Sequence, residues 1–69
     1  MNESVYKIID LVGASESSWE DAATQAIEKA SRSVRDLRIA EVQKLDIKIE
    51  AGKPALFRTN LRLSFKYND

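Results

Sequence analysis

Three carboxylates, Glu16, Glu20 and Asp21, lie close together in the sequence and are its candidate metal ligands. Carboxylate oxygens are the donors that hard divalent cations such as calcium prefer. Such a site is favoured if several copies of the chain bring these residues together. The simpler interpretation is that the acids cap the start of a helix and complement the positive end of its dipole. The sequence leaves both interpretations open.

The chain contains no cysteine and no histidine, which removes the usual acyl-transfer triads and argues against a zinc site. Gly13 and Gly52 are its only glycines, so it has no glycine-rich phosphate loop. Carboxylate pairs are present, but none stands out by a spacing that suits acid–base chemistry. We therefore expect a protein without enzymatic activity.

Eleven basic residues balance eleven acidic ones, whereas a nucleic-acid-binding domain normally carries a basic excess or stripe. No apolar run approaches the roughly 18 residues that a membrane-spanning helix needs. The first four residues, Met1-Asn2-Glu3-Ser4, lack the features of a secretory leader. The expected protein is cytoplasmic, with neither nucleic acid nor membrane as a partner.

Residues 4–12 are rich in β-branched and aromatic side chains and predict a strand. Its apolar residues fall on both faces, as in a strand covered on both sides. Gly13, Ala14 and Ser15 are expected to break it. A helix is predicted over 18–35, because apolar residues then recur at spacings of three and four.

Ser17 and Ser18 are alternative N-caps for this helix, and Ser17 forms a capping-box pattern with Glu20. Trp19, in the first turn, is the only tryptophan. Its ring could stack on a flat ligand, but packing against a neighbouring strand is the favoured interpretation.

The remaining chain predicts a long hairpin, with strands over 37–51 and 54–67 and a turn at Ala51-Gly52-Lys53-Pro54. The last strand alternates apolar and polar residues with a period of two. The preceding strand changes phase near Gln43 and Lys44, which predicts a β-bulge.

The hairpin is too long for one helix to cover. A strand of 14 residues spans about 46 Å, whereas an 18-residue helix spans about 27 Å. The apolar residues near the turn, Ile47, Ile49 and Phe57, therefore need another subunit. With no disulfide or zinc site available, self-assembly is the expected source of extra stability.

Charged residues share the polar faces of the two hairpin strands. Two interpretations remain: a solvated face with cross-strand ion pairs, or the charged lining of an enclosed, water-filled space. The residues are Arg58, Arg62 and Lys66 on one strand and Asp46, Lys48 and Glu50 on the other.

Nearly the whole chain resembles the dodecins. The resemblance rests on the order and spacing of several short runs and on the alanine-rich helix between them. The runs are Val5-Tyr6-Lys7, Val12-Gly13-Ala14-Ser15, Ala40-Glu41-Val42 and Leu63-Ser64-Phe65. It implies an α+β subunit with a β-α-β-β order, in which a three-stranded antiparallel sheet partly wraps around one helix. Residues 1–69 would form a single domain, and twelve copies would form a hollow homododecamer with the helices outside.

Many dodecins bind flavins, riboflavin or FMN, as stacked pairs at subunit contacts. The family places a tryptophan just before the Ala-Glu-Val run and a glutamine in the third strand, and this sequence has Ile39 and Arg58 there. Isoleucine has no π face, and arginine offers donors only. Where bacterial members place an arginine for a flavin phosphate, this chain has Asp46, whereas Lys66 matches a basic position associated with phosphate.

A flavin-free branch of the family is more similar, because it shares the aliphatic residue and a Ser-Trp-Glu helix start like Ser18-Trp19-Glu20. Some members of the broader family hold ions such as calcium at subunit contacts. The resemblance thus implies a cage-forming protein that stores a small ligand or ion and has a degenerate flavin site. A modified flavin site and a purely structural oligomer are the alternatives.

Overall fold

The computed structural model describes residues 5–67 of the chain. Residues 1–4, on which the prediction of no leader rests, and residues 68–69 lie outside the described part. The described elements are β1 (Tyr6–Ser15), α1 (Trp19–Ser31), β2 (Leu37–Glu50) and β3 (Lys53–Lys66). The predicted β-α-β-β order is confirmed.

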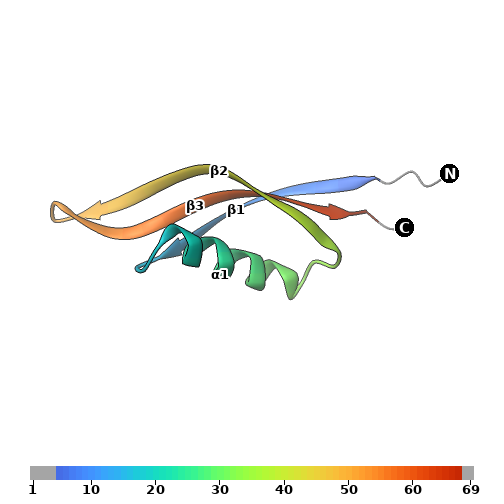
Figure 1. The fold of residues 1–69 in the computed structure, drawn as a ribbon, viewed down its shortest axis with the longest axis horizontal. Helices are drawn as coiled ribbons and strands as arrows, with labels where there is room; N and C mark the ends of the chain where they lie inside the picture. Colours follow the sequence, from blue (N-terminus) through green and yellow to red (C-terminus); the bar gives the residue numbers. More distant parts are fainter. Residues whose placement is uncertain (1–4, 68–69) are drawn as a thin grey trace.

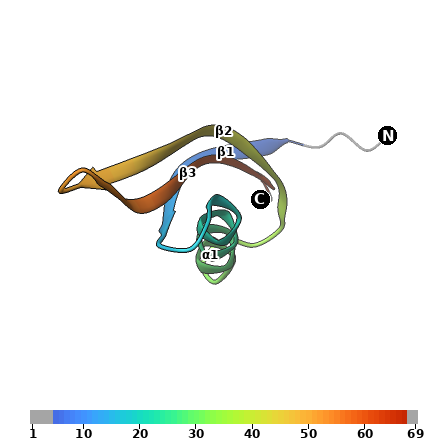
Figure 2. The ribbon, with the colours of Figure 1, turned by 60° about the vertical axis from the view of Figure 1, so that its left-hand side comes forward.

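The three strands form one antiparallel sheet in the order β1-β3-β2, so the last strand of the chain is the central one. Helix α1 lies against one face of this sheet (Figure 1). Seen from a second direction, the sheet curves over the helix (Figure 2). The hairpin of β2 and β3 extends past the start of α1 (Figure 1), as the comparison of strand and helix lengths predicts.

Strand β3 shows the predicted alternation. Leu61 and Leu63 point toward α1, are each 1% exposed, and form the core together with Ala30. Arg58 and Arg62 have the opposite parity and lie on the face that points away from the helix, here called the outer face. The central strand therefore separates an apolar face from a charged one.

The predicted β-bulge in β2 is confirmed by a register shift between Val42 and Lys44. On either side of this shift, Val42 of β2 pairs with Leu61 of β3, and Leu45 of β2 pairs with Thr59 of β3. The extra residue, Gln43, therefore places Val42 and Leu45 on the same face of the sheet, the one that faces α1.

The hairpin turn is shorter than predicted. Glu50 pairs directly with Lys53, and the two residues between them have positive φ angles, 51° for Ala51 and 75° for Gly52. This combination is typical of a two-residue type I′ turn. Pro54 already belongs to β3, but it lies beyond the end of β1, where β3 has a neighbour on one side only.

The predicted break at Gly13 is wrong, because β1 continues through it to Ser15. Gly13 is buried and pairs with Thr59. A Cβ atom at Gly13 would overlap the backbone carbonyl oxygen of Ala22 in α1. This glycine therefore permits a close approach between strand and helix and does not serve a turn.

The helix begins where predicted, with Ser18 as the correct one of the two alternative N-caps, whereas its predicted C-terminal end is wrong. Ser18 is the N-cap, because its Oγ accepts a hydrogen bond from the Asp21 N–H at 2.9 Å; the capping box of Ser17 with Glu20 is wrong. The Ser17 N–H instead donates to the Oγ of Ser15 at 2.9 Å.

At the other end, α1 stops at Ser31 and not near residue 35. The Ser33 N–H bonds back three residues to the Ala30 carbonyl, which tightens the last turn. Asp36 then adopts a positive φ of 60° that leads into β2. Nowhere in residues 5–67 is there a helix long and apolar enough to cross a membrane.

Replacing Gly13 with alanine should lower the free energy of unfolding by about 1–3 kcal/mol, because the new methyl group must push α1 off the sheet. The matched control is Gly52→Asn. Position 52 has open space around it, and asparagine tolerates a positive φ. Thermal melts followed by circular dichroism at equal protein concentration measure both. Equal midpoints for the two variants would contradict the close-approach role of Gly13.

Candidate functional site

Arg58 and Asp46 form a bidentate ion pair across β2 and β3. The two residues are directly opposite in the sheet register. The Arg58 Nε donates to Asp46 Oδ1 at 2.7 Å, and Nη2 donates to Oδ2 at 2.9 Å. The pair lies on the outer face, with the two side chains 46% and 40% exposed. Each side chain therefore compensates the other's charge, and two of the Arg58 donors meet the two carboxylate oxygens in fork-to-fork geometry.

The hydrogen bonds from Arg58 hold the pKa of the Asp46 carboxyl below its ordinary value. The same contact raises the pKa of the Arg58 guanidinium. Because the carboxyl pKa is lowered, the contribution of the ion pair to folding stability is fully present at pH values above the ordinary carboxyl pKa. It is lost only as the pH falls through the lowered pKa. The pair is therefore intact at neutral pH.

Ile39 and Lys66 lie far from this ion pair, near the other end of the outer face. Ile39 is 66% exposed and lies opposite Ser64, while Lys66 is half-buried. Ser64 and Arg58 are six residues apart on β3, which corresponds to about 20 Å. The four positions that match the family's flavin site thus fall into two separate pairs. One chain cannot bring Ile39 and Arg58 to opposite sides of one small ligand, so such a site needs two chains.

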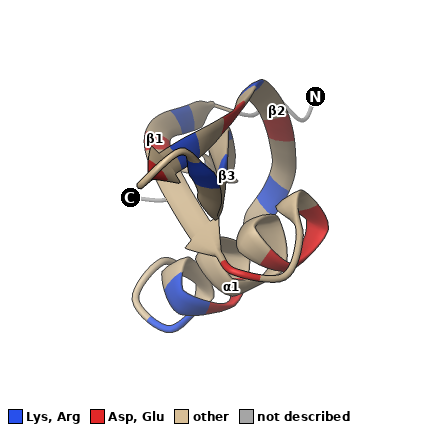
Figure 3. Ribbon diagram, turned by 90° about the vertical axis from the view of Figure 1, so that its left-hand side faces the viewer, with Lys and Arg blue, Asp and Glu red and all other residues tan. Residues whose placement is uncertain are grey.

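A second ion pair crosses the outer face between these two ends. The Arg62 Nε donates to Asp10 Oδ1 at 3.1 Å, and Glu41 lies opposite Arg62 on the other side. The hydrogen bond that Arg62 donates to Asp10, with a contribution from the Glu41 charge, raises the pKa of Arg62. Basic and acidic residues are interleaved along the strands (Figure 3). Of the cross-strand ion pairs predicted between the two hairpin strands, Arg58–Asp46 is confirmed. Arg62 instead pairs with Asp10 of β1, and Lys48 pairs with Glu50 within β2. The charges on the outer face are thus mixed in sign.

The acidic helix start is organised by hydrogen bonds within one chain. Asp21 Oδ2 accepts hydrogen bonds from Ser15 Oγ at 2.7 Å and from Gln25 Nε2 at 2.6 Å. Glu16 and Glu20 are exposed. Within residues 5–67, no three acidic side chains of a single chain gather as metal ligands.

Trp19 is half-buried and packs against the hairpin strands, as the favoured sequence interpretation predicts. Its ring meets Phe57 edge to face, with centroids 5.3 Å apart. Its indole Nε1–H donates to the backbone carbonyl of Asp46 at 3.1 Å. The start of α1 is thereby tied to the strand residue that holds Arg58.

Thr59 is a contributor that the sequence analysis missed. It is 1% exposed, and its hydroxyl donates to the Trp19 backbone carbonyl at 2.9 Å. The available signal was its position between Phe57 and Leu61, at the parity of the apolar residues of β3. A hydroxyl at a core position requires a hydrogen-bond partner.

Comparisons with known proteins agree with this architecture. The family model for dodecin matches residues 5–68. Calcium dodecin from Mycobacterium tuberculosis (strain ATCC 25618 / H37Rv) is 43% identical over 63 residues, which cover 91% of this chain and 89% of that protein.

Two solved structures illustrate the similarity. Dodecin from Streptomyces coelicolor superposes with a TM-score of 0.93 at 29% identity, covering 100% of this chain and 99% of that one. The structure of calcium dodecin from Mycobacterium tuberculosis, described as having a novel calcium-binding site, superposes with a TM-score of 0.85 at 42% identity. It covers 94% of this chain and 93% of that one. With a family match over nearly its whole length, this chain belongs to the dodecin family.

Proposed function

We propose that twelve copies of this chain form a hollow cytoplasmic particle that binds and stores a small ligand or ion without catalysing a reaction. The observation that carries the ligand part of this proposal is the Arg58–Asp46 ion pair. Two positions that match the family's flavin site are occupied by side chains that bind each other. A flavin would have to compete with that pair.

Self-assembly is supported by the shape of one chain. Its accessible surface is 5445 Å², whereas a compact monomer of this length exposes about 4,400 Å². Its radius of gyration is 14.3 Å, against about 11 Å for a compact chain of 69 residues. The described residues include ten exposed large hydrophobic side chains, among them Val5, Tyr6 and Ile8. Surface of this kind is stable in water when other copies cover it.

A degenerate flavin site is supported at both ends of the outer face. The exposed Ile39 offers no ring to stack on an isoalloxazine. Arg58 directs two of its donors at Asp46 and has no acceptor for the ring edge. The ionised Asp46 carboxylate also has no donor to offer a phosphate. A modified flavin site is the second candidate, because Lys66 remains on this face where a phosphate could meet it.

Calcium is the favoured ion for this particle. Calcium dodecin, the relative with 43% identity, carries the ion in its name. Here Glu16 and Glu20 are exposed carboxylates beside the ordered Asp21. Oxygen-only ligands suit calcium. Subunit contacts that bring two or three helix starts together would complete the coordination that one chain lacks.

The first expected outcome is obligate assembly. Light scattering of the purified protein should give a particle of about twelve chains, because the elongated subunit leaves its apolar surface uncovered. A well-folded monomer at micromolar concentration would rule out the proposed particle.

Calcium should raise the thermal midpoint relative to excess chelator, because a ligand that binds only the folded form stabilises it. Glu16→Gln combined with Glu20→Gln should abolish this increase while leaving the Asp21 hydrogen bonds in place. The control removes two other exposed carboxylates, Glu28 and Glu50, by the same change and should retain the increase. Identical wild-type midpoints in calcium, magnesium and chelator would exclude a stabilising ion.

The unmodified protein should bind riboflavin or FMN at least ~100-fold more weakly than a dodecin that has the tryptophan, because stacking and hydrogen bonds are lost. Ile39→Trp with Arg58→Gln should recover binding, and adding Asp46→Arg should favour FMN through its phosphate. Quenching of flavin fluorescence measures each step.

The ion pair makes a further control necessary, because Arg58→Gln leaves Asp46 without its arginine partner. Ile39→Trp with Arg58→Gln and Asp46→Asn separates this charge effect from the pocket itself. Tight, quenching flavin binding by the unmodified protein would overturn the degenerate site. An intact particle that binds neither flavin nor calcium would leave a purely structural role.

A further inference from the structure

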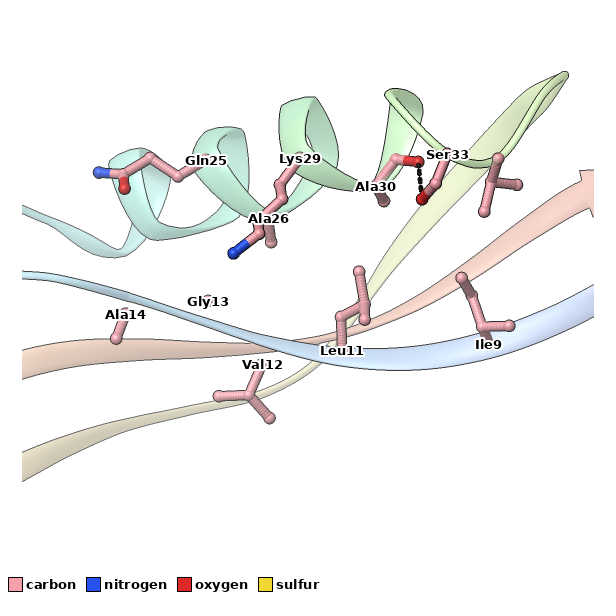
Figure 4. Close-up of a pocket in the computed structure, with 11 residues that line it drawn as sticks. Ile9, Leu11, Val12, Gly13, Ala14, Gln25, Ala26, Lys29, Ala30 and Ser33 are labelled. Carbon is pink, nitrogen blue, oxygen red and sulfur yellow. Dashed lines mark hydrogen bonds between the residues drawn. The ribbon is translucent and has the colours of Figure 1, made fainter.

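Within residues 5–67, two apolar surfaces that the chain itself leaves uncovered lie at opposite edges of the sheet. The first is a groove of about 430 Å³ between β1 and α1, here called the β1 groove. Figure 4 shows Lys29 reaching from the helix toward β1 at this groove. The lining includes Ile9, Leu11, Gly13, Ala26, Lys29 and Ala30.

The β1 groove continues around the free edge of β1. Val12 and Ala14, which point to the outer face, line it together with residues that point toward α1. Strand β1 pairs only with β3 and does so without a register shift. A regular edge strand of this kind can accept a strand from another chain.

The second surface is an apolar row along β2, the opposite edge strand, here called the β2 stripe: Val42, Leu45, Ile47 and Ile49. Val42, Leu45 and Ile49 are 53%, 49% and 66% exposed, so α1 of the same chain leaves them largely open. The bulge at Gln43 aligns Val42 with the rest of the row. Without it, the row would be split between the two faces of the sheet.

These two surfaces complement each other in length and direction. The β2 stripe spans seven residue steps, about 23 Å, and β1 with its ten residues spans about 33 Å. The stripe lies on the face of its own sheet that carries α1. Consider a second copy whose β2 lies beside β1 of the first copy, with α1 on the same side of both sheets. The β2 stripe of the second copy then points toward α1 of the first copy. The charged outer faces of both copies remain together on the other side.

We infer that the β2 stripe of one copy covers the β1 groove of a neighbouring copy; this contact rests on the proposed assembly. The excess of exposed surface, about 1,000 Å² over a compact monomer, is comparable to the roughly 800 Å² that each partner of a standard interface buries. Different surfaces meet in this contact, so it is heterologous. Because the proposed particle is closed, repeated contacts of this type would close into a ring and not extend as an open filament.

Because the native chain has no cysteine, paired cysteines can report this contact. The test variant carries Lys29→Cys in the groove and Leu45→Cys in the stripe. The matched control carries Lys29→Cys with Lys44→Cys, since Lys44 is adjacent to Leu45 but lies opposite Asn60 on the outer face. Both proteins are oxidised mildly and separated on a non-reducing gel.

The expected result is loss of nearly all free thiol in the Leu45 variant, with a ladder that continues beyond dimers and ends at the size of the ring. The control should keep its thiols. Cross-linking in the control alone, or a Leu45 ladder that stops at dimers, would overturn the contact. Ile47→Cys replaces Leu45→Cys if the first variant fails to fold.

Light scattering before oxidation distinguishes the two levels of the proposal. A twelve-chain particle without the Leu45 cross-link would refute this contact and leave the assembly standing. A monomeric wild-type protein would refute the assembly itself.

Discussion

The close packing of one short helix on a much longer sheet is the constraint on which the rest of this structure depends. Helix α1 has 13 residues, whereas β2 and β3 have 14 residues each and extend past it. Small residues permit the contact: Gly13 has no Cβ, and Ala22 is fully buried. Ala30 meets Leu61 and Leu63 at the centre of the sheet. This core is too small to cover both edge strands, and surface is therefore left for other subunits.

The two faces of the sheet differ in chemistry: one is apolar and the other is charged. The face that carries α1 is apolar and continues onto the exposed part of β2. The outer face carries ion pairs between β2 and β3 and between β1 and β3. Such exposed pairs contribute little to stability, but they keep the face wettable without a net field of one sign. This combination suits a sheet whose outer face lines a water-filled space.

Arg58 and Asp46 each depart from the residue that the family resemblance implies at that position, and the ion pair between them links the two departures. A lone arginine or a lone aspartate at these positions would present an uncompensated charge to a ligand. Together they form a neutral, fork-to-fork contact with short hydrogen bonds. The Trp19 indole holds the backbone of the same aspartate. A ligand that bound Arg58 or Asp46 would first have to separate these two side chains.

The sequence by itself determined the order of the elements, the two faces of β3, the bulge near Gln43 and the need for other subunits. These follow from periodicity, length and composition, which are local or global properties of the chain. Only the tertiary structure decided that Gly13 lies within a strand, that β3 is central and that Ser18, not Ser17, caps the helix. It also decided that Arg58 meets Asp46 and that Arg62 meets Asp10, 52 residues away. Such contacts depend on register and on the distance between segments remote in sequence, and residue type and spacing do not specify either one.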